Sequence, residues 1–286
     1  MSVLYGKRCP RYESYEATTF YKSNRLWNLA LEPGAHPPVD LLPILDYLPE
    51  RWAPWKKLAR EARHIQRGLY FGLVTETEER MRRGEENGCY MEEVIARQKE
   101  FLLDREMVGY LGGVMLEGGS ETTASFLHSL VLFLVASPES QRKAQEEIDR
   151  VIGRERLPNL EDIHDLPYIR ALIKETHRYR PVAPLQLPHA TIADEEMLNT
   201  MNLVWAFDFK PAKDADGQDI PADVNAYEKG IIPGPKPFDC IAAPRHAKVA
   251  EIIQREFREA TDTFVKFERD LAPEDKEFVA QQRAGL

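Results

Sequence analysis

The sequence has few cysteines, with only Cys9, Cys89 and Cys240 among its 286 residues. Their number is odd, they lie far apart, and none belongs to a Cys-x-x-Cys pair. This pattern argues against a disulfide framework and against a zinc site, and no residue is expected to bind a metal ion directly. It indicates a protein of a reducing compartment.

Positive charge is also in deficit, because 38 lysines and arginines stand against 47 acidic residues and give a formal net charge of -9. Such a chain has little positive field with which to attract phosphate backbones, so nucleic acid is not an expected partner. The basic group Arg80, Arg82 and Arg83 is predicted to be an exposed helix face in water.

Long apolar runs are missing as well. The longest, Phe126 to Ala136, is interrupted by His128 and Ser129 and is shorter than the ~20 residues that a membrane span requires. Met1 to Arg11 contains no apolar core of the kind found in signal peptides. The sequence therefore predicts a soluble chain without a membrane span.

The sequence does contain enough apolar residues, 43% of the total, to bury a core. Their spacing predicts a mainly α protein with few strands. Helices are expected over Tyr12 to Leu31, Pro54 to about Arg83, Met91 to Phe101, Met107 to Ala136, Glu139 to Ile152, Tyr168 to Tyr179 and Val249 to Phe264; short strands are expected over Leu185 to Ile192 and Phe238 to Ala243.

Gly118-Gly119-Ser120-Glu121-Thr122-Thr123 interrupts the apolar helix predicted from Met107 to Ala136. Each glycine costs about 0.5–1 kcal/mol relative to alanine inside a helix, and a buried carboxylate costs more unless it is paired or protonated. Such a group of unfavourable choices indicates a functional site. A helix bend, in which a threonine hydroxyl bonds back to the preceding turn, explains the same residues equally well.

Glu175 and Arg178 lie three residues apart in a predicted helix, so their side chains are expected to pair on one face. Pairs of this kind are common on helix surfaces and carry little functional information alone. An extended segment bounded by prolines, with Leu187-Pro188-His189-Ala190-Thr191, follows closely.

In this order, GGSETTA, LPYIRALIKETHR and PHA resemble signature segments of the cytochrome P450 superfamily. The segments EPGAHPPVDLLP and PERWAPWK, from Glu32 onward, resemble the fungal branch of that family. The resemblance covers Tyr5 to Asp194, with Asn199 to Arg245 similar to the end of the family's sequence. It implies a partial P450 fold with a long central helix, a Glu-x-x-Arg helix and few short strands. Residues 1–286 then form a single mostly helical domain, with family segments missing before residue 5 and between about 194 and 199.

The resemblance also implies roles for individual residues. Glu121 and Thr122 correspond to the acid and alcohol that deliver protons to iron-bound dioxygen, and Gly118, Gly119 and Thr123 to the substrate pocket. Glu175 and Arg178 correspond to a structural pair behind the haem. His189 corresponds to a contact with a haem propionate, although a turn histidine after proline is an equal alternative.

One family element is absent from the sequence. The family's Phe-x-x-Gly-x-Arg-x-Cys-x-Gly loop supplies the only protein ligand of the haem iron. Around Cys240 the corresponding positions hold Pro233, Lys236, Phe238 and Ala242, and Cys9 precedes every other motif. Haem binding is therefore predicted to be weak or absent, with His177 or His189 as an adventitious ligand, and a redox reductase is a partner only if haem binds.

Three functions stay open at this point. The first is a monooxygenase by descent, connected with the oxidation of a small hydrophobic metabolite in secondary metabolism and no longer competent for that reaction. The second is a haem-free protein that binds an apolar ligand, or acts on it without redox chemistry, in the remaining pocket, with Glu121 as a possible acid whose pKa burial would raise. The third is a helical interaction protein without a pocket. The expected location is the cytoplasm or the surface of the endoplasmic reticulum.

Overall fold

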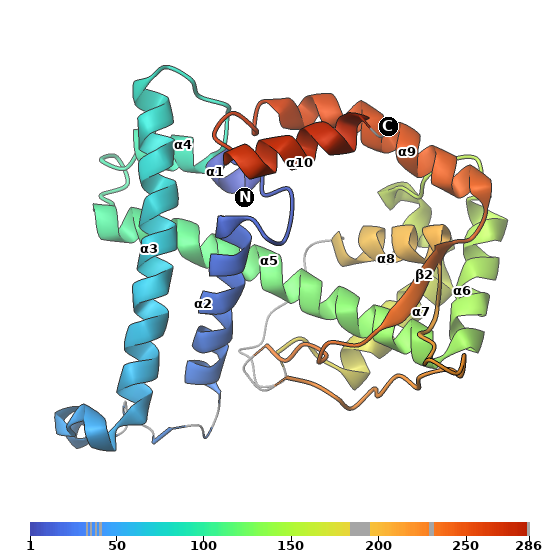
Figure 1. Cartoon of the computed structure of the whole chain (residues 1–286), viewed down its shortest axis with the longest axis horizontal. Helices are drawn as coiled ribbons and strands as arrows, with labels where there is room; N and C mark the ends of the chain where they lie inside the picture. The colour runs from blue at the N-terminus through green and yellow to red at the C-terminus, as the bar shows by residue number, and fades with distance from the viewer. Residues whose placement is uncertain are drawn as a thin grey trace. The chain divides into compact units, whose positions relative to one another are not determined.

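The computed structural model describes residues 1–32, 34, 36–37, 39, 42–183, 195–228 and 232–284, apart from the side chains of 195–198. The chain divides into two compact units, which we describe separately. Unit 1 comprises Met1–Ser120 and Phe257–Leu286, and unit 2 comprises Glu121–Glu256. Helices dominate both units (Figure 1), which confirms the prediction of a mainly α fold. That the chain forms a single domain stays a prediction.

Unit 1 is organised around a long helix, α3 (Pro54–Arg82), with α2 (Tyr15–Leu31) packed along it (Figure 1). Pro54 occupies the first turn of α3, where its missing N–H leaves no bond unmade. The unit also contains the first half of α5 (Arg105–Ala136), the end of α9 (Ala247–Val265) and five shorter elements: α1 (Ser2–Tyr5), α4 (Tyr90–Ala96), α10 (Pro273–Ala284) and the 3₁₀ turns η1 (Pro43–Tyr47) and η2 (Glu50–Trp52).

Three glycines allow the first half of α5 to pack closely within unit 1. A side chain at Gly109 would lie 2.6 Å from the Phe71 ring, and one at Gly113 would collide with the ring of Tyr70. At Gly112 a side chain would collide with Tyr5. The apolar core of the unit gathers around these contacts and includes Leu4, Tyr5, Phe20, Leu69, Tyr70, Leu73, Val74, Met91, Val108 and Leu116.

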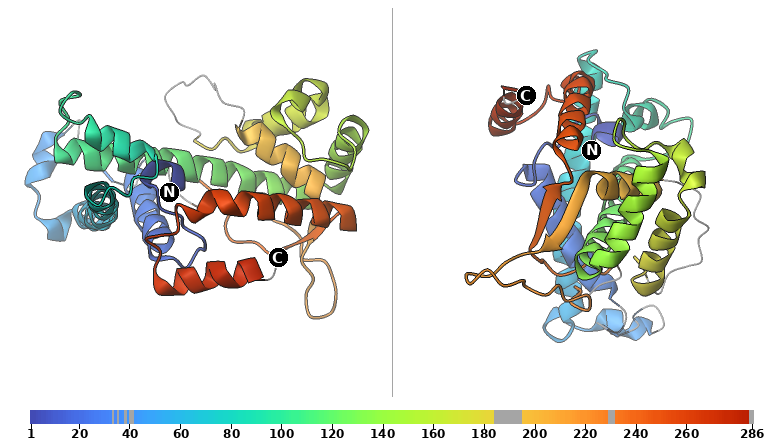
Figure 2. Two further views of the ribbon diagram at one scale, coloured as in Figure 1. Left: turned by 90° about the horizontal axis from the view of Figure 1, so that it is seen from above. Right: turned by 90° about the vertical axis from the view of Figure 1, so that its right-hand side faces the viewer.

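Unit 2 contains the second half of α5 and three further helices that pack against one another (Figure 2), namely α6 (Pro138–Val151), α7 (Pro167–Tyr179) and α8 (Glu195–Ala206). It also contains the 3₁₀ turn η3 (Leu160–Asp165), the strands β1 (Phe207–Pro211) and β2 (Cys240–Pro244), and most of α9. β1 pairs antiparallel with β2, with Phe209 opposite Ala242. The core of the unit includes Phe126, Leu130, Leu134, Ile148, Leu166, Ile169, Val204, Trp205, Phe209 and Val249.

Two side chains of α6 fix its neighbours. The carboxylate of Glu147 accepts hydrogen bonds from the backbone N–H groups of Tyr168 and Ile169, both at 2.9 Å, and so caps the N-terminus of α7. The Gln141 amide exchanges two hydrogen bonds with the backbone of Phe209, at 2.7 and 3.0 Å. These contacts join α6 to both α7 and β1.

Most of the predicted helices are confirmed, with differences at their ends. α4 stops at Ala96 rather than at Phe101, and Leu102 adopts a left-handed backbone with φ 54°. β1, α8 and α10 were not predicted from the sequence. The predicted strand Leu185 to Ile192 lies outside the described residues. The second predicted strand, Phe238 to Ala243, corresponds to β2.

Among the described helices, α5 meets the length and composition of a membrane span, although core helices of soluble proteins pass the same test. Its apolar residues are not uniformly covered. Val114 is 62% exposed and Met115 is 40% exposed.

Candidate functional site

The predicted catalytic motif lies in the middle of α5. Gly118 and Gly119 are exposed, whereas Glu121, Thr122 and Thr123 are half-buried. A side chain at either glycine would meet nothing within 4 Å. Close packing within the described residues therefore does not explain these two glycines, in contrast to Gly109, Gly112 and Gly113. Their assignment to a substrate pocket stays a prediction.

The alternative explanation of this motif, a bend caused by a hydroxyl bonding back to the helix, also stays open. α5 contains one such bond beyond the motif, from the Oγ of Ser129 to the carbonyl of Ser125 at 2.9 Å. Bonds of this type loosen a helix without any catalytic purpose.

A carboxylate that the sequence reasoning missed lies one turn before Glu121. Oε1 of Glu117 accepts hydrogen bonds from Nε2 of Gln66, at 2.8 Å, and from the hydroxyl of Tyr70. Burial raises the pKa of Glu117, and these two donors only partly oppose it. Burial, followed by the neighbouring carboxylate, also raises the pKa of Tyr70. The sequence did contain a signal for Glu117. It lies four residues before Glu121, so the two acids share one face of an apolar helix.

Unit 1 contains a cavity of about 540 Å³ that the motif reaches through Ser120. Its walls are formed by residues of α2, α5 and α9, by the first two residues of the chain and by the segment after α1: Met1, Ser2, Arg8, Cys9, Pro10, Arg11, Tyr12, Ala17, Phe20, Tyr21, Leu116, Ser120 and Phe264. Neither Gly118 nor Gly119 is among the described residues that line it. The volume lies within the roughly 300–1,000 Å³ of small-molecule sites.

The two arginines of this cavity are already engaged. Arg8 forms an ion pair with Glu268 and lies 4.9 Å from the centre of the Phe264 ring. Arg11 forms an ion pair with Asp275. Both arginines of the cavity are therefore neutralised by acidic partners, and the remaining contacts for a ligand include aromatic and aliphatic side chains.

The predicted pair on α7 is confirmed as a pair. Arg178 donates two hydrogen bonds of 2.7 Å to the two carboxylate oxygens of Glu175. This contact holds the pKa of Glu175 below its ordinary value. Both side chains are exposed, at 60% and 68%. The pair is therefore a surface ion pair of small energetic weight, and its family role behind a haem stays a prediction.

Of the two histidines considered as iron ligands, the described residues include His177 alone. His177 stacks on Phe126, with ring centroids 4.5 Å apart and planes 20° from parallel. His189 lies outside the described residues. Within the described residues no group of three histidine, cysteine or acidic side chains has the arrangement of a metal site.

The three thiols of this chain are all free, with Cys89 buried and Cys9 and Cys240 half-buried. A thiol must be deprotonated to bind iron, and reactive thiolates occur beside cations or helix N-termini that lower the pKa. Burial instead raises the pKa of Cys9, of Cys89 and of Cys240. Cys240 is the only cysteine of unit 2, which holds Glu121 and the α7 pair, and it lies in β2. We therefore assign no haem ligand in this structure.

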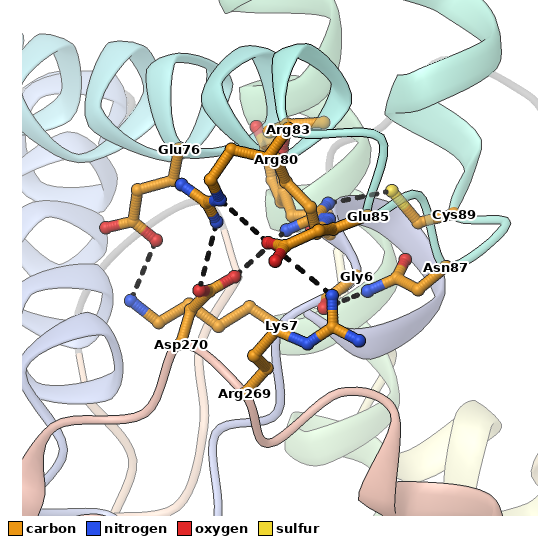
Figure 3. Close-up of polar contacts among 12 residues, drawn as sticks. Gly6, Lys7, Glu76, Arg80, Arg83, Glu85, Asn87, Cys89, Arg269 and Asp270 are labelled. Atoms are coloured by element: carbon orange, nitrogen blue, oxygen red, sulfur yellow. Dashed lines mark hydrogen bonds and ion pairs between the residues drawn. The ribbon is translucent and has the colours of Figure 1, made fainter.

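The basic group at the end of α3 differs from the prediction. Arg80 is only 2% exposed, because its guanidinium lies among partners from three segments (Figure 3). It donates to Glu92 at 2.9 Å and to the carbonyl of Tyr5 at 2.8 Å, and it lies 3.6 Å from Asp270. The prediction of an exposed face is thus wrong for Arg80, whose burial is compensated because each of its three guanidinium nitrogens has a partner.

Comparison with known proteins identifies the family. The model of the cytochrome P450 family matches residues 1–201. A cytochrome P450 monooxygenase of Armillaria gallica is 30% identical over 346 residues, which cover 94% of this chain and 66% of the relative. The cytochrome P450 monooxygenase atE of Aspergillus terreus is 37% identical over 204 residues, which cover 71% of this chain and 38% of the relative. The chain therefore belongs to the cytochrome P450 family.

The chain matches only part of the length of these relatives, 66% of the Armillaria gallica protein and 38% of atE. That alignment is 346 positions long and the whole chain has 286 residues, so the relative alone fills at least 60 positions. The shorter alignment with atE takes in 71% of this chain over 204 positions and needs almost no such gaps. The family model likewise ends at residue 201.

Proposed function

We propose that this chain descends from a fungal monooxygenase that oxidised a small hydrophobic metabolite and that it does not perform haem-thiolate chemistry in its present form. The observation that carries the proposal is that none of the three cysteines stands in the family's Phe-x-x-Gly-x-Arg-x-Cys-x-Gly pattern. The 60 or more positions filled only by the Armillaria gallica relative support it.

The physical reason lies in the ligand. In this family the axial thiolate supplies the electron density that oxygen cleavage requires, and a neutral histidine or a protonated thiol does not replace it. Glu121 and Thr122 would then retain an acid and an alcohol from an ancestral site without its reaction. A redox reductase, which the family implies as partner, would have no electron acceptor here. We expect the chain in the cytoplasm or at the surface of the endoplasmic reticulum.

A haem titration of the full chain tests this proposal. We expect either no saturable absorbance change or a weak one that is identical in the triple variant C9S/C89S/C240S. A matched variant, His177→Phe, shows whether any weak signal arises from the histidine stacked on Phe126. Stoichiometric binding that the triple variant loses would overturn the proposal.

A second candidate function is binding of an apolar ligand without haem. The 540 Å³ cavity of unit 1 favours it, because Phe20, Leu116 and Phe264 give it apolar walls and both of its arginines are engaged. A panel of small hydrophobic compounds should raise the melting temperature of the wild type and have less effect on Ser120→Phe, which narrows the cavity. If no compound raises the melting temperature of the wild type, the third hypothesis, an interaction protein without a ligand pocket, is favoured.

A further inference from the structure

A groove of about 360 Å³ lies at the contact between α2 and α3, the two helices that pack side by side in unit 1 (Figure 1). α2 contributes four residues with the spacing of one helix face and α3 contributes three, namely Tyr15, Thr18, Thr19, Lys22, His64, Ile65 and Gly68. All of them belong to unit 1, and none lines the 540 Å³ cavity. The volume lies within the roughly 300–1,000 Å³ of small-molecule sites.

The groove combines two basic side chains with no acidic one. Lys22 and His64 both line it and both are exposed, so a ligand in the groove can reach them. Within the described part of the chain, neither forms an ion pair with a carboxylate, although the sequence contains 47 acidic residues against 38 lysines and arginines. A concave site with basic groups and no acid attracts an anion.

Neighbouring cations of α3 are neutralised by acids. Arg60, one turn before His64, lies 2.9 Å from a carboxylate oxygen of Glu50. Arg67, one turn after His64, pairs with both carboxylate oxygens of Glu106. The two basic side chains of the groove have no such partner among the described residues, so their donors stay available to a ligand. An ammonium group offers three N–H donors, and an imidazole ring can donate a hydrogen bond in either protonation state.

Gly68 gives the groove room for the body of a ligand. It lies inside α3, where glycine is less favourable than alanine, and a side chain there would meet nothing within 4 Å. Packing among the described residues therefore does not explain this glycine. A ligand that lies against the helix does explain it, because any side chain would occupy the same space. Ile65 and the ring of Tyr15 add apolar surface to the groove.

We propose that this groove binds a small organic anion whose carboxylate accepts hydrogen bonds from Lys22 and His64 and whose apolar ring lies against Gly68 and Ile65. The proposal does not depend on the functions proposed above, because the groove and the 540 Å³ cavity have no lining residue in common.

Equilibrium dialysis of the full chain against two probes tests the proposal. 2-Naphthoate carries the carboxylate, and 2-naphthamide has the same rings without the charge. Wild type should bind 2-naphthoate more tightly than 2-naphthamide, and added salt should reduce the difference. Lys22→Met should weaken 2-naphthoate binding by about two- to five-fold, as expected for one exposed ion pair, and leave 2-naphthamide binding unchanged. Gly68→Leu, which fills the groove, should weaken binding of both probes.

Three variants serve as matched controls and should bind 2-naphthoate as wild type does. Lys57→Met removes an exposed lysine of α3 outside the groove, and Gly72→Leu replaces another glycine of α3 that meets nothing within 4 Å and does not line the groove. Ser120→Phe narrows the 540 Å³ cavity. Circular dichroism establishes whether each variant is folded.

Four results would each overturn the proposal. 2-Naphthoate fails to bind, or it binds no more tightly than 2-naphthamide. Lys22→Met weakens its binding no more than Lys57→Met does. A folded Gly68→Leu binds it as tightly as Gly72→Leu does. A folded Ser120→Phe loses it, which would place the probe in the 540 Å³ cavity instead.

Discussion

The hydroxyl of Tyr70 on α3 donates a hydrogen bond to Oε1 of Glu117 on α5, one residue before the glycine pair of the motif. Nε2 of Gln66 donates to the same oxygen at 2.8 Å. Burial raises the pKa of Glu117 above its ordinary 4.5 in spite of these donors. The folded state therefore keeps a proton on this carboxyl at pH values where the unfolded chain has already released it.

This shift makes stability depend on pH in a defined direction. The contribution of Glu117 is fully present below the ordinary pKa of 4.5 and is lost as the pH rises through the higher folded value. Glu117→Gln keeps an acceptor for Gln66 and Tyr70 but cannot ionise. We expect its free energy of unfolding to exceed that of wild type by a margin that grows from pH 4 to pH 7, measured by urea denaturation. A margin that is constant with pH would contradict this account.

The glycines of α5 should fall into two classes. Gly113→Ala should destabilise unit 1 by about 1–3 kcal/mol, because the added carbon collides with the Tyr70 ring. Gly118→Ala meets nothing within 4 Å and should stabilise the helix by roughly 0.5–1 kcal/mol. Thermal unfolding of the two variants compares them directly. Equal effects of the two substitutions would be inconsistent with the packing described for α5.

Arg80 and Arg178 should differ sharply in their contribution to stability. Arg80 is 2% exposed and satisfies Glu92, so Arg80→Ala should cost about 3–5 kcal/mol by leaving a buried carboxylate unpaired. Arg178 belongs to an exposed pair, so Arg178→Ala should cost about 0–1 kcal/mol. Urea denaturation measures both. A large loss in Arg178→Ala would indicate that the Glu175–Arg178 pair has a structural role beyond the contacts described.

The cap that Glu147 provides for α7 can be tested in the same way. Glu147→Ala removes the acceptor for the N–H groups of Tyr168 and Ile169 and should lower the free energy of unfolding by about 0.5–2 kcal/mol. Glu146→Ala is the matched control, because Glu146 is exposed and pairs with Arg142 at the surface. Similar losses in the two variants would argue against the cap.

Much of the helical architecture could be predicted from local patterns. Pro54 and Pro138 mark the starts of α3 and α6, and apolar spacing gives the extents of α3, α5 and α9. β1 was missed because it depends on partners distant in sequence, namely β2 and the side chain of Gln141. Nothing within Phe207–Pro211 alone specifies these contacts.

The candidate site was less predictable. The three-residue spacing of Glu175 and Arg178 was enough to predict their contact, since both residues lie on one helix. The burial of Arg80 was not predictable from its basic neighbours, because its partners Tyr5 and Asp270 come from opposite ends of the sequence. The same limit applies to Glu117, whose raised pKa depends on its burial against α3.

The reduced carbon monoxide difference spectrum of the full chain, reconstituted with haem, tests most directly the central claim that this member of the family provides no thiolate to iron. We predict that any bound haem gives the Soret band of a protein without a sulfur ligand, unchanged in C9S/C89S/C240S. A thiolate-type Soret shift in the wild type that disappears in this variant would contradict the account.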